Sequence, residues 1–136
     1  MHTTNYYNTF IEVAEDCPVV SAEVPPQKGD AKTVAGIQFN LVYVHPYAYS
    51  SDDVLFKAYA EKNKIPGDQL AVEREKFFSK GQPCFRASPL TKRYGWGLHS
   101  NADGMVALHA MESDEYRKLQ QDASVKHLKA MRSKKG

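Results

Sequence analysis

The chain has 136 residues, of which 42% are hydrophobic and 25% charged, a composition typical of a globular protein. It contains no run of about 18 apolar residues, which excludes a membrane-spanning helix, and its first residues lack the features of a signal peptide. The two cysteines, Cys17 and Cys84, are too few for a disulfide framework. We therefore expect two free thiols in a cytoplasmic protein.

The net charge of +2 is unevenly distributed along the chain. Residues 117–136 contain seven Lys or Arg and one acid, giving +6, whereas residues 1–116 contain eleven Lys or Arg and fifteen acids, giving −4. A basic tail can bind nucleic acid, but cations also favour the C-terminal end of a helix. We expect 117–136 to be the end of a helix with a frayed tail, and we do not expect nucleic-acid binding.

The first third of the chain predicts a strand, a long connection and one ambiguous segment. Alternating apolar residues indicate a strand at 6–14, and prolines and a glycine indicate an irregular connection at 16–32. The apolar residues of 33–45 alternate as in a strand, and β-branched and aromatic residues favour that reading. They also form one helical face, Val34, Ile37, Leu41 and Val44, behind a suitable N-cap at Thr33.

Two helices are predicted next. Serine and aspartate residues at 50–53 are typical of a helix start, and Pro66 and Gly67 stop a helix that we place at 51–63. A second helix is expected at 68–80, with Asp68 as its cap and Gly81 as its end.

The remainder predicts a sheet and a final helix. Strands are expected at 83–88, 93–99 and 105–110, with a hairpin turn at 101–104 whose Asp103 and Gly104 suit positive φ angles. Ser113 is placed to cap a last helix at 113–131. The sequence thus predicts a single α+β domain with an antiparallel sheet of about four strands, 93–99 being central. Helices 51–63, 68–80 and 113–131 are expected to cover one face of this sheet.

Several stretches resemble a known family. They are TNY at 4–6 through DCP at 16–18, PY at 46–47, YSSDDVLF at 49–56, FFSKGQPC at 77–84, RASPL at 86–90 and RYGWG at 93–97. With these residues, nearly the whole chain resembles an uncharacterised family of small bacterial proteins, known as a conserved domain of unknown function. The resemblance implies a helix at 33–45, and it implies no activity, substrate or cofactor.

The main candidate binding site is cationic. Residues 76–102 contain no acid and carry five Lys or Arg. Guanidinium groups bind phosphate or carboxylate through paired hydrogen bonds, so we predict an anion site formed by Arg86, Lys92, Arg93 and His99. The alternative is that these cations form surface salt bridges with acids of neighbouring helices.

Other residues of this region have two readings each. Cys84 is the candidate catalytic or redox thiol, because nearby cations lower a thiol pKa, or it is a small buried hydrophobe. Tyr94 and Trp96 share a strand face and either stack on a ligand or lie in the core, which we favour. His99 and His109 could bind a metal with Cys84, although isolated histidines are usually structural. We expect no metal and no cofactor.

The leading functional prediction is a small cytoplasmic module that binds an anionic small molecule or a protein partner, including a second copy of the chain. The glycines at 95 and 97 support it, because they thin one face of the central strand and allow close approach there. The alternative is an enzyme or redox protein that uses Cys84 as its reactive thiol.

Overall fold

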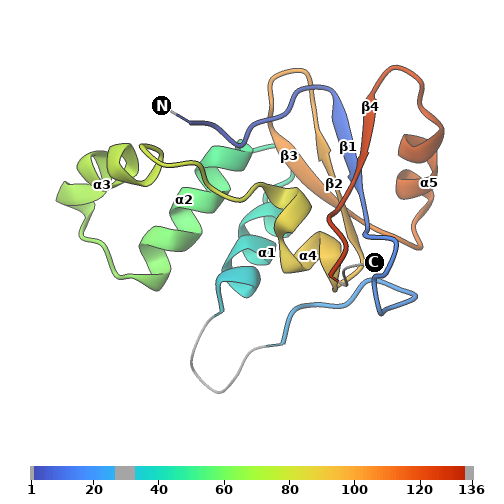
Figure 1. Ribbon diagram of the computed structural model, residues 1–136, viewed down its shortest axis with the longest axis horizontal. Coiled ribbons are helices and arrows are strands. Elements are labelled where there is room, and N and C mark those ends of the chain that lie inside the picture. Colours follow the sequence, from blue (N-terminus) through green and yellow to red (C-terminus); the bar gives the residue numbers. More distant parts are fainter. Residues whose placement is uncertain (1, 27–32, 134–136) are drawn as a thin grey trace.

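A computed structural model describes residues 2–26 and 33–133 and contains a four-stranded sheet with helices beside it (Figure 1). The strand order is β3-β2-β1-β4. The strands are β1 (Thr9–Glu12), β2 (Trp96–Ser100), β3 (Val106–Ala110) and β4 (Lys126–Lys129). The α+β class is confirmed, as is the interior position of β2. The prediction of an antiparallel sheet is wrong, because β1 pairs with β4 in parallel while β1–β2 and β2–β3 are antiparallel.

The parallel strand replaces the second half of the helix predicted at 113–131. Helix α5 (Asp114–Gln121) is capped by Ser113 as expected, but it ends at Asp122, whose carboxylate accepts hydrogen bonds from the backbone N–H and hydroxyl of Ser124. This local turn competes with helical hydrogen bonding. The following residues pair with β1, and Leu128, opposite Ile11, packs against the core.

Helix α5 covers the second face of the sheet, so the expectation that all helices lie on one face is also wrong. Strands β3 and β4 run in the same direction at opposite edges, and parallel strands need a crossover that returns over one face. Helix α5 is that crossover (Figure 1). Its Tyr116 packs edge-on against Phe10 of β1, with ring centroids 5.0 Å apart.

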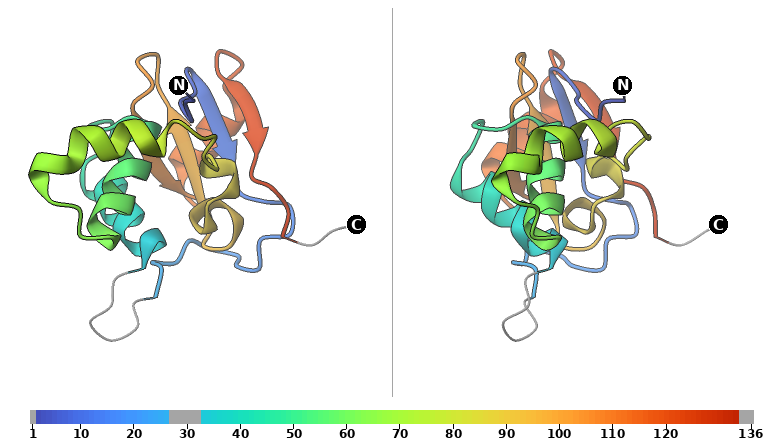
Figure 2. Two further views of the ribbon diagram at one scale, coloured as in Figure 1. Left: turned by 60° about the vertical axis from the view of Figure 1, so that its left-hand side comes forward. Right: turned by 90° about the vertical axis from the view of Figure 1, so that its left-hand side faces the viewer.

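The first face is covered by α1 (Val34–Val44), α2 (Ser51–Lys62) and the short α4 (Pro89–Lys92). The main core lies between them and the sheet and includes Ile11, Phe39, Val54, Leu90 and Leu98. Helix α3 (Leu70–Phe77), preceded by the 3₁₀ turn η1 (Gly67–Gln69), is the outermost helix (Figure 2). Helix α3 ends three residues before the predicted end. Asp68, the predicted cap, lies within η1 and does not cap α3.

Helix α1 confirms the helical reading of 33–45, with Thr33 accepting a hydrogen bond from the N–H of Gly36. The predicted face is rotated, however. The helix buries Ile37, Gln38, Phe39 and Val42, and its ends are exposed. Helix α2 begins with the expected serine cap, here a complete capping box at Ser50.

Residues 83–88 do not form the predicted strand. They contain the 3₁₀ turn η2 (Phe85–Ala87), which leads into α4. Ser88 caps α4 and Pro89 occupies its first turn, where a missing N–H costs nothing. These local signals favour helical turns over a strand. In addition, the interior strands β1 and β2 each already have two neighbours in the sheet, so neither can pair with 83–88.

The hairpin at 101–104 is confirmed, but of its residues only Gly104, at φ +82°, has a positive φ. Trp96 is buried as predicted, and Tyr94 is partly buried against the same core. Part of the expected connection, 27–32, and the end of the expected frayed tail, 134–136, lie outside the described residues. Among those described, no helix is long and apolar enough to cross a bilayer.

Gly97 has no side chain, which lets α5 approach the sheet closely, as its position in the sequence suggested. A Cβ at this residue would lie 2.6 Å from the Tyr116 ring and 2.7 Å from the Phe10 ring. We predict that Gly97→Ala lowers the free energy of unfolding by about 1–3 kcal/mol, because both rings must move. Gly67→Ala is the matched control, since its Cβ would meet nothing within 4 Å. Urea denaturation of both variants measures this, and equal stabilities would contradict it.

Candidate functional site

A partly open pocket of about 280 Å³ lies between α1, α2 and the irregular segment that leads through η2 to α4. Its size approaches the lower end of the range for small-molecule sites. Helix α1 contributes Val34, Ala35 and Gln38; α2 and the residue after it contribute Leu55, Tyr59 and Asn63; the rest of the lining is Phe77, Gln82, Pro83, Cys84, Ala87, Ser88 and Pro89. None of these described lining residues is charged.

Gln38 is the unusual member of this lining. It is 6% exposed, and its carbonyl oxygen accepts a hydrogen bond of 3.4 Å from the Ser88 hydroxyl. The same hydroxyl accepts from the N–H of Leu90, which leaves it a donor to Gln38 and orients the amide. Within residues 2–26 and 33–133, the two N–H groups of this amide have no hydrogen-bond partner. The amide nitrogen is not itself fully buried, so it is accessible to an acceptor group of a molecule bound in the pocket.

Cys84 forms part of the pocket wall and is partly buried. Its Sγ lies 3.5 Å from the hydroxyl of Tyr6, which comes from the segment before β1. The hydrogen bond with Cys84 raises the pKa of Tyr6, burial raises it further, and the positive charge of Arg86 opposes both. Tyr6 is therefore a protonated donor available to the sulfur at neutral pH.

The four residues of the predicted anion site do not share one surface. Lys92 and Arg93 lie at the end of α4, on the first face of the sheet, and Arg86 donates its Nε–H to the carbonyl of Lys129. His99 alternates with buried Leu98 on β2 and so lies on the other face. Among the described residues these three cations form no salt bridge. The acids Asp53 and Glu73 pair instead with Arg74 and Lys76.

Two other hollows are larger but more open. One, of about 410 Å³, lies against the outer side of α1 and α2 and includes Lys57 and Glu61. Another, of about 380 Å³, lies between α2 and α3 and includes Arg74. Neither hollow is lined by a cysteine, so the smaller pocket beside Cys84 is the better candidate for thiol chemistry.

A second polar constellation lies on the α5 side of the sheet. The hydroxyl of Tyr47 is 2.8 Å from His99 Nδ1 and 3.3 Å from His109 Nε2, so one hydroxyl bridges both imidazoles. Tyr47 has φ +59°, a strained conformation for a bulky residue. Its N–H bonds to the carbonyl of Val106, which ties the 45–50 segment along the edge of β3.

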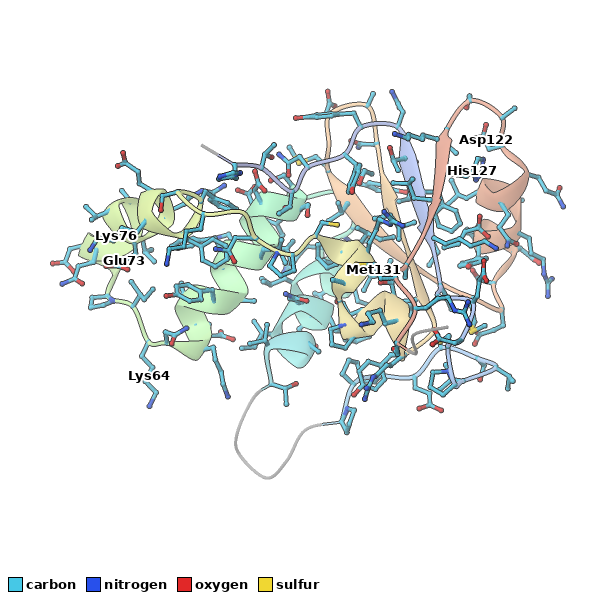
Figure 3. All side chains as sticks on the ribbon, viewed as in Figure 1. Lys64, Glu73, Lys76, Asp122, His127 and Met131 are labelled. Carbon is cyan, nitrogen blue, oxygen red and sulfur yellow. The ribbon has the colours of Figure 1, made fainter. Side chains whose placement is uncertain are left out.

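The imidazoles of this cluster favour the neutral form. Burial lowers the pKa of His99, and the charge of Asp122 opposes this. Burial and the neighbouring His99 lower the pKa of His109, while Glu115 opposes the shift. Asp122 lies at the end of α5 next to His127 of β4, whose Nε2 is 2.8 Å from the Asp122 carbonyl oxygen (Figure 3). In the described part of the chain, no three His, Cys, Asp or Glu form a metal-binding group.

Sequence reasoning brought His99 and His109 together but missed three residues: Gln38, Tyr6 and Tyr47. A signal existed for Gln38, because it lies four residues from both Val34 and Val42 on one face of the helix. Nothing local pointed to Tyr6 or Tyr47, whose partners are 78 and 52 residues away.

The Tyr47–His99–His109 cluster predicts an acid-sensitive stability. Because both imidazole pKa values are lowered in the fold, the unfolded chain binds protons more readily. Stability is then complete above the ordinary histidine pKa of about 6.5 and is lost as pH falls below it. We predict that His99→Gln/His109→Gln loses less stability than wild type between pH 7.5 and 5, as measured by urea denaturation. His45→Gln controls for replacing an imidazole elsewhere, and identical losses in wild type and the double variant would contradict the account.

Comparison with known proteins identifies a family. Residues 1–136 match the profile of a family described as a family of unknown function (DUF6157). No curated protein and no solved structure matches the chain. The match extends over the whole sequence, which confirms the resemblance to an uncharacterised family. The chain belongs to the family of unknown function DUF6157.

Proposed function

We propose that this protein is a binding module for a neutral, largely apolar small molecule that carries a hydrogen-bond acceptor. The observation that carries the proposal is the side-chain amide of Gln38, which lines an apolar pocket and whose N–H groups have no partner among the described residues. A ligand carbonyl can accept from this amide while its apolar part contacts side chains such as Leu55 and Phe77. Two free thiols suit a reducing compartment, so we place this function in the cytoplasm.

The size of the pocket limits the ligand. A cavity of about 150 Å³ holds one benzene molecule, so about 280 Å³ admits a single ring with a short side chain. A suitable probe is 4-phenyl-2-butanone, which has one ring and one carbonyl. Ordinary ligand efficiency for a molecule of this size gives a Kd of about a few millimolar. NMR titration can measure an affinity in this range.

Gln38→Leu separates a ligand-binding role from a structural role. The variant keeps the bulk of the side chain but removes the acceptor of the Ser88 hydroxyl as well as the free donors, so its free energy of unfolding should fall by about 1 kcal/mol. Loss of the hydrogen bond should weaken binding of 4-phenyl-2-butanone about three- to tenfold. Asn40→Leu, which removes an exposed amide from the same helix, is the matched control and should bind as wild type does. Unchanged affinity together with a large loss of stability in Gln38→Leu would make the amide structural.

Ala35→Leu tests the location of the binding site. The added side chain would occupy the pocket from α1, where leucine is a good helix former, and should abolish binding of the probe. Ala71→Leu, on exposed α3, places the same bulk at a different hollow and should leave binding intact. Binding that survives Ala35→Leu would move the site elsewhere.

A second candidate is binding of an anionic small molecule through Arg86, Lys92 and Arg93, with His99 on the other face. The observation in its favour is the absence of salt bridges to these three cations within the described chain. The discriminating probe is 3-phenylpropanoate, an anion of similar size to the ketone. Tighter binding of the anion, weakened by Arg86→Ala/Arg93→Ala, would favour this candidate. Tighter binding of the ketone, unaffected by those substitutions, favours the neutral ligand.

A further inference from the structure

Cys84 and Gln38 face the same pocket, which places a thiol and a free amide donor around one bound molecule. We propose that Cys84 adds covalently to a neutral α,β-unsaturated carbonyl compound bound there, with Gln38 holding the carbonyl oxygen. This inference rests on the proposed function, because it names the reactive class to which the ligand belongs.

The class of electrophile follows from the surroundings of the sulfur. Among the described residues, the hydrogen-bond partner of Cys84 Sγ is the Tyr6 hydroxyl, and neither an imidazole nor a carboxylate contacts it. Acyl transfer needs a general acid for its leaving group, and these contacts supply no catalytic base–acid pair. Conjugate addition needs no leaving group, and a soft thiolate is its natural nucleophile.

The addition balances without another reactant. The thiol of Cys84 loses its proton to water, and the Tyr6 hydroxyl, 3.5 Å from Sγ, can donate to the resulting thiolate. The sulfur forms a bond to the β-carbon as the carbon–carbon π bond breaks. The electron pair moves to the carbonyl oxygen, where the enolate accepts hydrogen bonds from the Gln38 amide. Water returns a proton to the α-carbon, so the net change is addition of S–H across the double bond.

The second cysteine provides an internal comparison. Cys17 is also a partly buried free thiol, but it packs against the main core and does not line this pocket. Chemistry that depends only on a free thiol would modify whichever cysteine is more accessible. Chemistry that depends on the pocket should select Cys84.

The test compares two ketones that differ by one double bond. The electrophile is 4-phenyl-3-buten-2-one, and 4-phenyl-2-butanone is its unreactive analogue. Intact mass and peptide mapping locate and time the adduct in wild type, Cys17→Ser, Cys84→Ser and Gln38→Leu. We expect one adduct on Cys84 in wild type and Cys17→Ser, a rate that saturates with enone concentration, and inhibition by the saturated ketone.

The contribution of Gln38 is measured at saturating enone, relative to the rate of alkylation by iodoacetamide. Gln38→Leu should lower this ratio by about tenfold to a hundredfold. This loss is at most equal to the loss of rate caused by removing one oxyanion donor from a closed active site. A lower ratio supports transition-state stabilisation, because a merely structural role would change both reactions alike. An unchanged ratio would overturn the role of Gln38.

The outcomes separate this inference from the proposed function. If 4-phenyl-2-butanone binds but the enone leaves Cys84 unmodified, the covalent step is wrong and the binding function stands. Labelling of Cys17, or labelling of Cys84 that never saturates and ignores the saturated ketone, also overturns the covalent step. If the saturated ketone does not bind at all, the proposed function is wrong, and the covalent step that rests on it is wrong as well.

Discussion

A hydrogen bond from the hydroxyl of Thr91 to the carbonyl of Phe85 links the two short helical turns that form one wall of the pocket. Thr91 is completely buried and joins two helical turns, η2 and α4, that are too short to be stable alone. The backbone carbonyl of Thr91 accepts a hydrogen bond from the N–H of Ala14. The carbonyl of Arg86 accepts a hydrogen bond from the N–H of Met131. These bonds attach the two turns to the chain after β1 and after β4.

The pocket is a consequence of that attachment. The same short segment places Leu90 and Phe85 in the core and Cys84 in the pocket wall. Two turns cannot cover as much of α1 and α2 as a full helix, so a gap remains where Gln38 presents its amide. The N–H groups of this amide have no partner among the described residues, so a ligand acceptor in the pocket can bind them.

The sequence predicted the elements whose signals are local. Thr33, Ser50 and Ser113 cap helices as expected, and the hairpin around Gly104 follows from its turn residues. The errors arose where distant contacts decide the outcome. Residues 126–129 were expected in a helix, yet pairing with β1 makes them a strand. Residues 83–88 were expected to form a strand, but they contain η2 and lead into α4.

The site was predictable only in part for the same reason. Cys84 was identified from its cationic neighbours, but its structural partner is Tyr6, 78 residues away. The cationic run was evident, yet alternation along β2 separates His99 from Arg86, Lys92 and Arg93. Clustering in the sequence was thus a poor guide to clustering in space, and a polar residue spaced with valines on one helical face was the better signal.

The central claim is that the Gln38 amide is a recognition group for a ligand in this pocket. Intermolecular nuclear Overhauser effects between 4-phenyl-2-butanone and the protein test it most directly. The account predicts contacts from the ligand to the Gln38 side-chain N–H groups and to the methyl groups of Leu55 and Ala87, which line the pocket. Contacts confined to other surfaces, with the Gln38 amide signals unmoved at saturation, would contradict it.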